Sequence, residues 1–304
     1  MRISDFARIT SSEIVNTGDI DSFEGISFDS TRISRQNLYI HKSTDNQALK
    51  KAVENLCYAV LFIEDIPILD DQIAWIKTDN ITKSLISFIK YKNLNSRLIY
   101  LDDICFDIIK SICIDKDITF VEGDLTKVFN KTINSEDKIT NIKELSSISN
   151  NIESKNNVKI EIIKKSLFST VINYKDTLFD IAMPYIYIPK LIFCISLLED
   201  MGLKYDISNC TLEKCFKIVF VDNRLNIKKY GSTSKAIIFQ QDEFFDESRE
   251  YLETYAKWAN IDYIRSSSNS LSNNFNYVLT TLDIDEFFKA FNKNTQIEKN
   301  LFTL

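Results

Sequence analysis

The sequence predicts an α/β protein made of three successive segments, residues 1–95, 96–211 and 212–304. Two observations predict this class. Short apolar runs typical of buried strands alternate with segments whose apolar residues recur at helical spacing, along the whole chain. The 304 residues are 44% apolar and 26% charged, an ordinary composition for a folded protein with a sizeable core.

In the first segment we expect a helix and three strands, then a helix, two strands and a closing helix. The longer helices are predicted from apolar residues at helical spacing, as at Leu49, Ala52 and Leu56. The ranges, in chain order, are Ile3–Ala7, Ser11–Val15, Gly25–Phe28, Asn37–Ile40, Asn46–Cys57, Tyr58–Ile63, Ala74–Ile76 and Asn80–Tyr91.

The second segment continues the alternation and then becomes polar. Strand, helix, strand and helix are expected over Arg97–Leu101, Ile104–Cys113, Ile118–Val121 and Thr126–Thr132. Residues 134–157 are rich in Ser, Asn, Glu and Lys and have little periodicity, so we expect a polar, flexible connection there. The apolar spacing of Ile139, Ile142 and Leu145 is an alternative sign of one short helix.

Strands return from Val158, and Pro184–Met201 is expected to be a helix that ends at Gly202. The last segment is again α/β. Its expected elements are Lys217–Val221, Ala236–Gln240, Asp246–Ala259, Ile261–Ile264, Asn276–Leu279 and Ile284–Asn292. The third of these is a helix whose inward face is expected to carry Tyr251, Leu252, Tyr255 and Trp258.

Composition and charge exclude several classes of protein. The net charge is −6 and the longest basic runs are pairs, so we expect no nucleic acid as partner, because phosphate binding needs clustered Lys and Arg. The N-terminus has no uninterrupted apolar stretch and no apolar run has the length of a membrane helix. We therefore expect no signal peptide, no membrane span and a cytoplasmic protein. The six cysteines form no CxxC pair and His41 is the single histidine, which favours reduced core thiols and no metal site.

Five stretches of the first segment resemble the N-terminal domain of the Mur ligase family. They are MRISDFARITSSEIV, GISFDSTRI, NLYI, TDNQALKKAVENLCYAVLF and IAWIKTDNITKSLISFIKYK, in the family's order. The most similar branch adds D-alanyl-D-alanine to UDP-N-acetylmuramoyl-tripeptide. The resemblance implies a Mur-ligase-type N-terminal domain over residues 1–95, which in the family holds the uridine diphosphate end of the muramyl substrate.

The resemblance also implies a set of ligand-binding residues. Ser30, Thr31 and Arg32 belong to the run that looks like the family's Asp-Ser/Thr-Arg loop. Asp45 belongs to the run that looks like its Asp-Gly-His stretch. Hydroxyls and a guanidinium suit the oxygens of ribose and diphosphate. The alternative is that Asp29 and Ser30 only build the turn between two strands.

The nucleotide loop of the family is missing from its expected place. There the family follows a strand with Gly-rich backbone amides and a Lys that hold the phosphates of ATP. Here the stretch reads LNSRLIYLDDICFDIIKSIC, with Asp102 and Asp103 at the turn and neither Gly nor Lys-Thr. A second candidate, with Gly123 and Lys127, lacks the second Gly and the Gly-Lys-Ser/Thr ending. We therefore expect no cofactor and no catalytic residues.

Two later stretches extend the resemblance. AMPYIYIPKLIFCISLLEDMGLKYD looks like the family's helix after a Pro-Gly-x-His-Asn turn, with apolar or aromatic residues in place of the polar ones. The final third matches the family's Rossmann-like domain in layout only. They imply a reduced central domain over residues 96–211 and a small Rossmann-like C-terminal domain over residues 212–304.

The sequence therefore favours a catalytically degenerate Mur-ligase-like protein of peptidoglycan precursor metabolism. Its expected partner is a UDP-N-acetylmuramoyl-peptide or a cell-wall synthesis protein. Two alternatives stay open. One is a protein–protein interaction module built on a remnant of the fold, and the other is an active ATP-dependent amide ligase with a divergent site.

Overall fold

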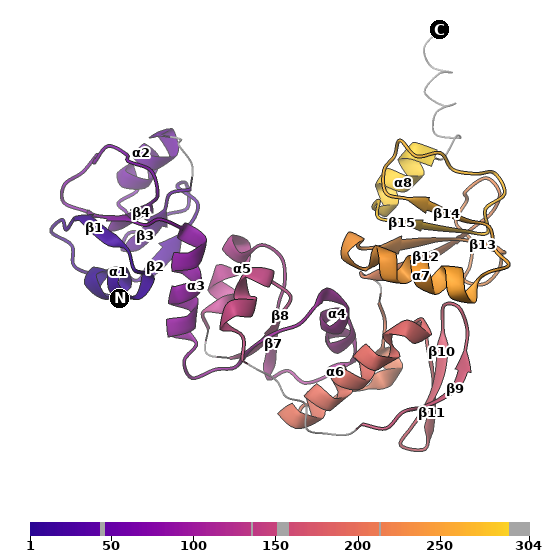
Figure 1. Cartoon of the computed structure of the whole chain (residues 1–304). Coiled ribbons are helices and arrows are strands. Elements are labelled where there is room, and N and C mark those ends of the chain that lie inside the picture. The colour runs from indigo at the N-terminus through magenta and orange to yellow at the C-terminus, as the bar shows by residue number, and fades with distance from the viewer. Residues whose placement is uncertain (43–45, 135, 151–157, 213, 292–304) are drawn as a thin grey trace, which may run out of the picture. The chain divides into compact units, whose positions relative to one another are not determined.

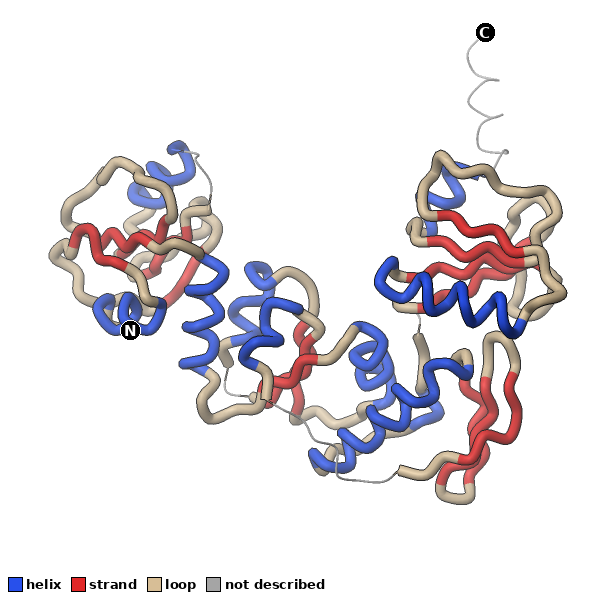
Figure 2. The backbone as a smooth tube through the Cα atoms, viewed as in Figure 1, coloured by secondary structure: helices blue, strands red, loops and turns tan. Residues whose placement is uncertain are grey.

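The computed structural model describes residues 1–42, 46–134, 136–150, 158–212 and 214–291 (Figure 1). Strands alternate with helices along the chain (Figure 2), which confirms the α/β class. The chain forms two compact units. Unit 1 comprises residues 1–100 and 116–151, and unit 2 comprises residues 101–115 and 152–304. The division into three domains, with boundaries after residues 95 and 211, stays a prediction.

A five-stranded sheet forms the first part of unit 1. Its order is β1 (Glu13–Asn16), β5 (Ala74–Lys77), β4 (Ala59–Phe62), β3 (Asn37–Ile40), β2 (Gly25–Ser27). Strands β2 to β5 are parallel, and β1 is antiparallel to β5. Leu38 and Ile40 pack in a core with α1 (Ile3–Thr10) and α3 (Ile81–Lys92), whereas Tyr39 packs on the other face with α2 (Asn46–Glu54). The carboxyl ends of the parallel strands thus share one edge, where open α/β sheets bind ligands.

A three-stranded parallel sheet completes unit 1. Its order is β6 (Leu98–Tyr100), β8 (Asp137–Thr140), β7 (Ile118–Val121), with the helix α5 (Leu125–Thr132) after β7. Phe88 of α3 stacks on Phe129 of α5, with ring centroids 6.1 Å apart. Leu98 of β6 belongs to the same core as Phe88 and Phe129. The two sheets of unit 1 therefore share one apolar core, and residue 95 lies between two elements of that core.

The structure differs from the expected flexible connection over residues 134–157. Residues 137–140 form β8, the central strand of the three-stranded sheet, and the 3₁₀ helix η1 (Lys143–Ile148) follows it. Residue 135 and residues 151–157 lie outside the described part. The reason for the error is Lys138, a charged residue in mid-strand. It is fully buried because oxygens from four other residues accept from its ammonium group.

The first part of unit 2 combines two helices with an antiparallel meander. The elements are α4 (Asp103–Ile112), β9 (Glu161–Lys165), β10 (Thr170–Tyr174), β11 (Thr177–Ile181), the short 3₁₀ turns η2 (Tyr185–Tyr187) and η3 (Ile207–Asn209), and α6 (Ile188–Met201). Helix α6 ends at Gly202, whose φ of +72° suits a residue without Cβ. The predicted end of this helix is confirmed, while its first predicted turn is the 3₁₀ turn η2.

A four-stranded sheet forms the rest of unit 2. Its order is β12 (Phe216–Val221), β13 (Lys235–Gln240), β15 (Tyr277–Thr280), β14 (Ile261–Ile264), and only β12 runs antiparallel to its neighbour. The short η4 (Asp242–Phe244) and the helix α7 (Phe245–Tyr255) follow β13, and α8 (Ile284–Phe291) follows β15. Tyr251 and Leu252 are buried as predicted, but Tyr255 is 52% and Trp258 69% exposed. The prediction was wrong for both: Tyr255 is the last residue of α7, and Trp258 lies beyond it, where helical spacing no longer orients side chains.

No helix in the described ranges is long and apolar enough to cross a membrane. The six cysteines are free thiols. Five are buried and Cys113 is half-buried, as expected for core positions. Burial raises the pKa of Cys57 to about 12, so this thiol stays protonated at neutral pH.

Candidate functional site

The Asp29–Arg32 loop follows β2 and is closed by its own hydrogen bonds. The Asp29 carboxylate accepts from the Thr31 hydroxyl at 2.7 Å and from the Thr31 backbone N–H at 2.8 Å. These two bonds hold the pKa of Asp29 below its ordinary value. The side-chain amide of Asn55 donates to the Ser30 carbonyl at 2.8 Å. The loop is therefore a self-satisfied turn tied to the residue that follows α2.

The structure gives the predicted ligand-binding residues different environments. Ser30 is only 8% exposed, and the Thr31 hydroxyl donates to Asp29. The Arg32 side chain is 86% exposed, with its Nε 3.7 Å from the Asp29 carboxylate. Asp45 lies outside the described residues. Thr31 and Arg32 are exposed and Ser30 is buried, and the ligand-binding role of the set stays a prediction.

A cavity of 230 Å³ opens at the carboxyl ends of β3 and β4. Its lining comes from the segment after β3, the segment after β4 and the first residue of α2. The lining residues are His41, Lys42, Asn46, Ile63, Glu64, Asp65, Ile66 and Pro67. None of them belongs to the Asp29–Arg32 loop. This cavity therefore occupies the position where an α/β sheet binds ligands, and the predicted loop does not form its wall.

Lys42 supplies the positive charge of this cavity. Its Nζ lies 5.2 Å from the centre of the Phe28 ring. Burial lowers the pKa of Lys42, and the charge of Asp124 opposes that effect. A partly desolvated ammonium is suited to a phosphate or carboxylate, and the Glu64 carboxylate can accept from hydroxyl or N–H groups of the same ligand. Sequence reasoning missed Lys42, although its place two residues after the predicted strand Asn37–Ile40 was a usable signal.

The turn before α4 holds an internal ion pair. One carboxylate oxygen of Asp102 accepts from the Cys105 backbone N–H at 2.8 Å, which caps the helix. The other oxygen accepts from the Lys190 ammonium at 2.7 Å. Burial alone would lower the pKa of Lys190, but the hydrogen bond and the charge of Asp102 outweigh it and raise that pKa. The chain's own carboxylate thus occupies the first-turn amide that a phosphate group binds in a Gly-rich loop.

The other acidic residue of α4 that faces inward is structural. Asp107 accepts from the Lys214 backbone N–H at 3.1 Å, and burial raises its pKa. Within the part of the chain that the structure describes, no group of three His, Cys, Asp or Glu residues is placed to hold a metal ion.

Comparison with known proteins places the chain by its fold. No family model and no curated protein sequence matches it. The structure matches the MurF ligase of Thermotoga maritima, solved in complex with ADP, with a TM-score of 0.55 and 10% identity over 90% of this chain and 98% of that chain. MurF from Acinetobacter baumannii matches with a TM-score of 0.51 and 10% identity over 87% and 79% of the two chains. The chain has the fold of a Mur ligase.

A further structure supports the same Mur ligase fold. The UDP-N-acetylmuramoylalanyl-D-glutamyl-2,6-diaminopimelate–D-alanyl-D-alanyl ligase of Acinetobacter baumannii matches with a TM-score of 0.50 and 10% identity. That match covers 95% of this chain and 82% of the ligase. The resemblance seen in the sequence is therefore confirmed at the level of fold, over most of the chain. At this identity the likeness concerns architecture and leaves ligand and activity to be argued from the residues.

Proposed function

We propose that this Mur-ligase-like protein binds a UDP-linked muramyl precursor and does not ligate it. The observation that carries the proposal is the Asp102–Lys190 ion pair at the start of α4. ATP-driven ligation needs phosphates held in line, mostly by backbone amides and cations. Here the cap amide and the nearby cation are both bound to a carboxylate of the chain itself.

Electrostatics oppose a triphosphate at this turn. Asp102 and Asp103 place two carboxylates where the family places glycines and a lysine, and Lys190 offsets the charge of Asp102 only. Two like charges about 4 Å apart repel by roughly 1 kcal/mol in water and roughly 4 kcal/mol near a protein surface. A bound triphosphate would also have to break the Asp102–Lys190 pair. The residues at this turn do not fit ATP.

The cavity after β3 and β4 supports the binding part of the proposal. It combines a cation, Lys42, with the acceptors Glu64 and Asp65 and the apolar side chains Ile63 and Ile66. A nucleotide sugar offers a diphosphate for the ammonium, N–H and hydroxyl donors for the carboxylates, and a base for the apolar wall. Nucleotide-sugar recognition, rather than phosphate transfer, is the chemistry these side chains suit.

Thermal-shift titration tests the proposal, because a ligand that binds only the native state raises the melting temperature by mass action. With UDP-N-acetylmuramoyl-tripeptide at about 100 times its dissociation constant, we expect stabilisation of about 2.7 kcal/mol. Lys42→Gln should weaken this shift, and Lys50→Gln, an exposed lysine on α2, serves as the matched control. Mg-ATP should give no shift. A shift with Mg-ATP, or release of phosphate, would instead support the active-ligase alternative.

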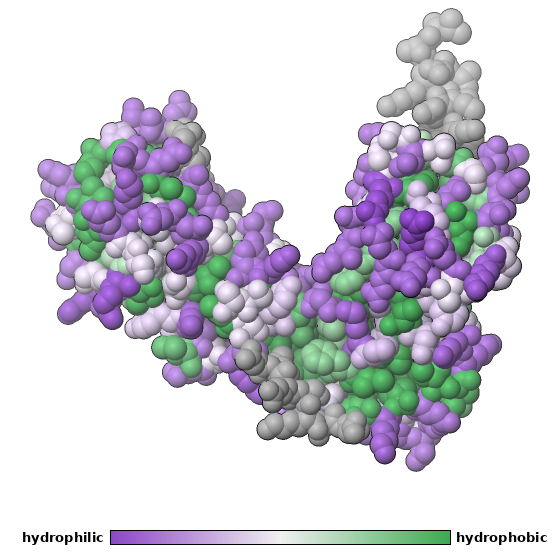
Figure 3. Space-filling view, viewed as in Figure 1, coloured by the Kyte–Doolittle hydropathy of each residue, from purple (hydrophilic) through white to green (hydrophobic). Residues whose placement is uncertain are grey.

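The interaction-module alternative is favoured by one feature of unit 2. Ile163 on β9 is 51% exposed and Leu178 on β11 is 66% exposed. Apolar residues gather over the β9–β11 meander in the space-filling view (Figure 3). Exposed apolar patches often mark protein interfaces. The absence of any shift with the muramyl nucleotide would replace the binding proposal with this one.

A further inference from the structure

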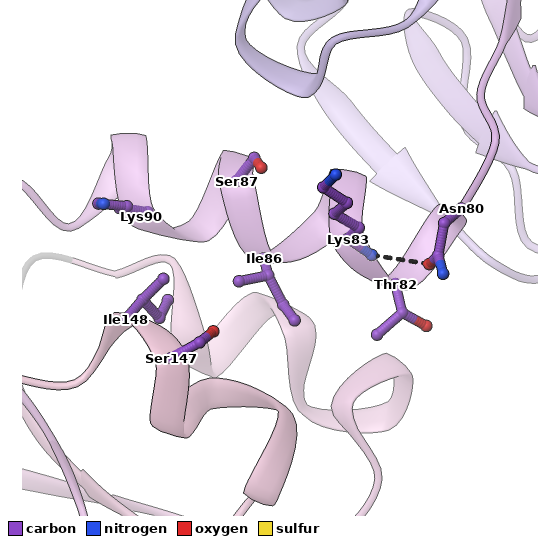
Figure 4. Close-up of a pocket in the computed structure, with 8 residues that line it drawn as sticks. All are labelled: Asn80, Thr82, Lys83, Ile86, Ser87, Lys90, Ser147 and Ile148. Carbon is purple, nitrogen blue, oxygen red and sulfur yellow. Dashed lines mark hydrogen bonds between the residues drawn. The ribbon is translucent and has the colours of Figure 1, made fainter.

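A second cavity of unit 1, of 400 Å³, lies between α3 and η1 (Figure 4). It shares no lining residue with the cavity after β3 and β4. Its lining residues are Asn80, Thr82, Lys83, Ile86, Ser87, Lys90, Ser147 and Ile148. The lining thus contains two lysines, three hydroxyl groups, an amide, two isoleucines and no carboxylate.

The two lysines of this cavity face no carboxylate among its lining residues, in a chain of net charge −6. Among the described residues, neither Lys83 nor Lys90 takes part in an ion pair, whereas Lys77 and Arg97 of the same unit each bind an aspartate. Both lysines are exposed at the cavity. Two uncompensated cations over a wall without acids make the cavity selective for anions.

The helix spacing aligns the polar groups. Lys83, Ser87 and Lys90 stand at positions i, i+4 and i+7 of α3, which form one row along a helix. The two lysine Cα atoms are about 10.5 Å apart along the axis, at about 1.5 Å per residue. Long lysine side chains can therefore reach one anion held between them. The Asn80 side chain already accepts from the Lys83 backbone N–H at 2.9 Å, so the side chains, and not the helix end, would hold the anion.

The other side of the cavity is apolar with a hydroxyl edge. In Figure 4, Ile86 projects from α3 toward η1, which carries Ser147 and Ile148, while Ser87 and the Lys83 side chain point to the other side of the helix. Both isoleucines are half-buried, so their exposed surface faces the cavity. A bare inorganic anion would leave this wall in contact with water, and a ligand with a carbon skeleton would cover it.

We propose that this cavity binds an organic phosphate. The phosphate lies between the ammonium groups of Lys83 and Lys90, and the carbon skeleton lies against Ile86 and Ile148, which line the same cavity. Charge-assisted hydrogen bonds from the two ammoniums satisfy the phosphate oxygens. The inference does not rest on the proposed function, because the two cavities have no residue in common.

Isothermal titration of the full chain with glucose 1-phosphate, inorganic phosphate and glucose tests this inference. We expect glucose 1-phosphate to bind more tightly than inorganic phosphate, and glucose to show no binding. The double variant Lys83→Gln/Lys90→Gln should weaken glucose 1-phosphate binding by about tenfold or more, since it removes two charge-assisted contacts. The variant Lys83→Arg/Lys90→Arg should retain binding.

The control Lys127→Gln/Lys131→Gln makes the same charge change on exposed lysines of α5 and should leave binding unchanged. Lys42→Gln should also leave it unchanged, so that failure here and failure of the proposed function can be told apart. Equal weakening by the control would overturn the inference in favour of non-specific attraction. If the native chain does not bind glucose 1-phosphate, the inference is overturned outright. If glucose 1-phosphate and inorganic phosphate bind with equal affinity, the proposed contact between the carbon skeleton and the isoleucines is refuted.

Discussion

Lys138 offers the sharpest test of how unit 1 is held together. Its side chain is fully buried in β8. Its ammonium donates to the Asn93 side-chain oxygen and to the Asn134 carbonyl, each at 2.7 Å, and to the Glu136 carbonyl. Lys138→Met keeps an unbranched apolar side chain, one heavy atom shorter than lysine, but removes every donor. The substitution therefore isolates the hydrogen bonds from the packing.

The expected loss follows from the acceptors left behind. The Asn93 oxygen is buried and keeps the Ser96 hydroxyl as a donor at 3.0 Å, so the variant loses there one hydrogen bond to a charged group, about 1.5–3 kcal/mol. The Asn134 and Glu136 carbonyls are partly accessible to water, so we count them at the low end of that range. Relief from burying a charge offsets part of this sum. We expect Lys138→Met to lower the free energy of unfolding of unit 1 by about 2–3 kcal/mol.

The pH dependence of this contribution has a defined sign. Burial lowers the pKa of Lys138, although the charges of Asp137 and Glu136 oppose the effect. Between the folded pKa and the ordinary value of about 10.4, the unfolded state binds more protons than the folded state, so stability rises with pH in that window. The Met variant lacks this rise. The difference in free energy of unfolding between the native protein and Lys138→Met should therefore grow as the pH rises through that window.

Urea unfolding, followed by the fluorescence of Trp75 in a Trp258→Phe background, measures the effect. Trp75 is fully buried in unit 1, whereas Trp258 belongs to unit 2. Lys131→Met, an exposed lysine on α5, is the control and should cost less than about 0.5 kcal/mol. A loss below about 1 kcal/mol for Lys138→Met would refute the reasoning, because water would then replace the ammonium at little cost.

Two further predictions concern carboxylates. Asp102→Ala removes both the cap on the Cys105 amide and the Lys190 ion pair, and should destabilise unit 2 by about 1–2 kcal/mol. Asp102→Asn keeps an oxygen that can cap the helix, so it should lower the stability of unit 2 by less than Asp102→Ala does. Equal losses of stability in calorimetry would show that the cap contributes nothing. Asp222 accepts from the Asn226 side chain and backbone, which lowers its pKa. Its stabilisation is present above the ordinary carboxyl pKa of about 3.9 and is lost as pH falls through the folded value. Asp222→Asn should therefore flatten the acid dependence of the melting temperature, and an unchanged profile would argue against it.

Local patterns were enough to predict most elements of this fold. The strands Asn37–Ile40 and Ile118–Val121 lie where short apolar runs placed them, and Gly202 ends α6 as predicted. Strand β8 was missed because the burial of Lys138 depends on tertiary packing that brings the Asn93 side chain, 45 residues away in the sequence, to its ammonium group. Trp258 was misplaced because the end of α7 carries no strong stop signal.

The candidate site shows the same limit. The sequence pointed to the Asp29–Arg32 loop, where the residue types suit a nucleotide sugar, but its hydrogen bonds close it on itself. The cavity after β3 and β4 became visible only when parallel pairing brought the ends of two strands to one edge. Lys42 therefore entered the site through topology rather than through a motif.

By itself, the sequence determined the α/β class, the resemblance to the Mur ligases and the loss of the Gly-rich turn, because each is written in neighbouring residues. Only the tertiary structure decided what replaced that turn. Asp102 and Lys190 are far apart in the chain, and their ion pair exists because α4 packs against α6. Charges and cavities that depend on such long-range contacts follow from packing, which no local pattern specifies.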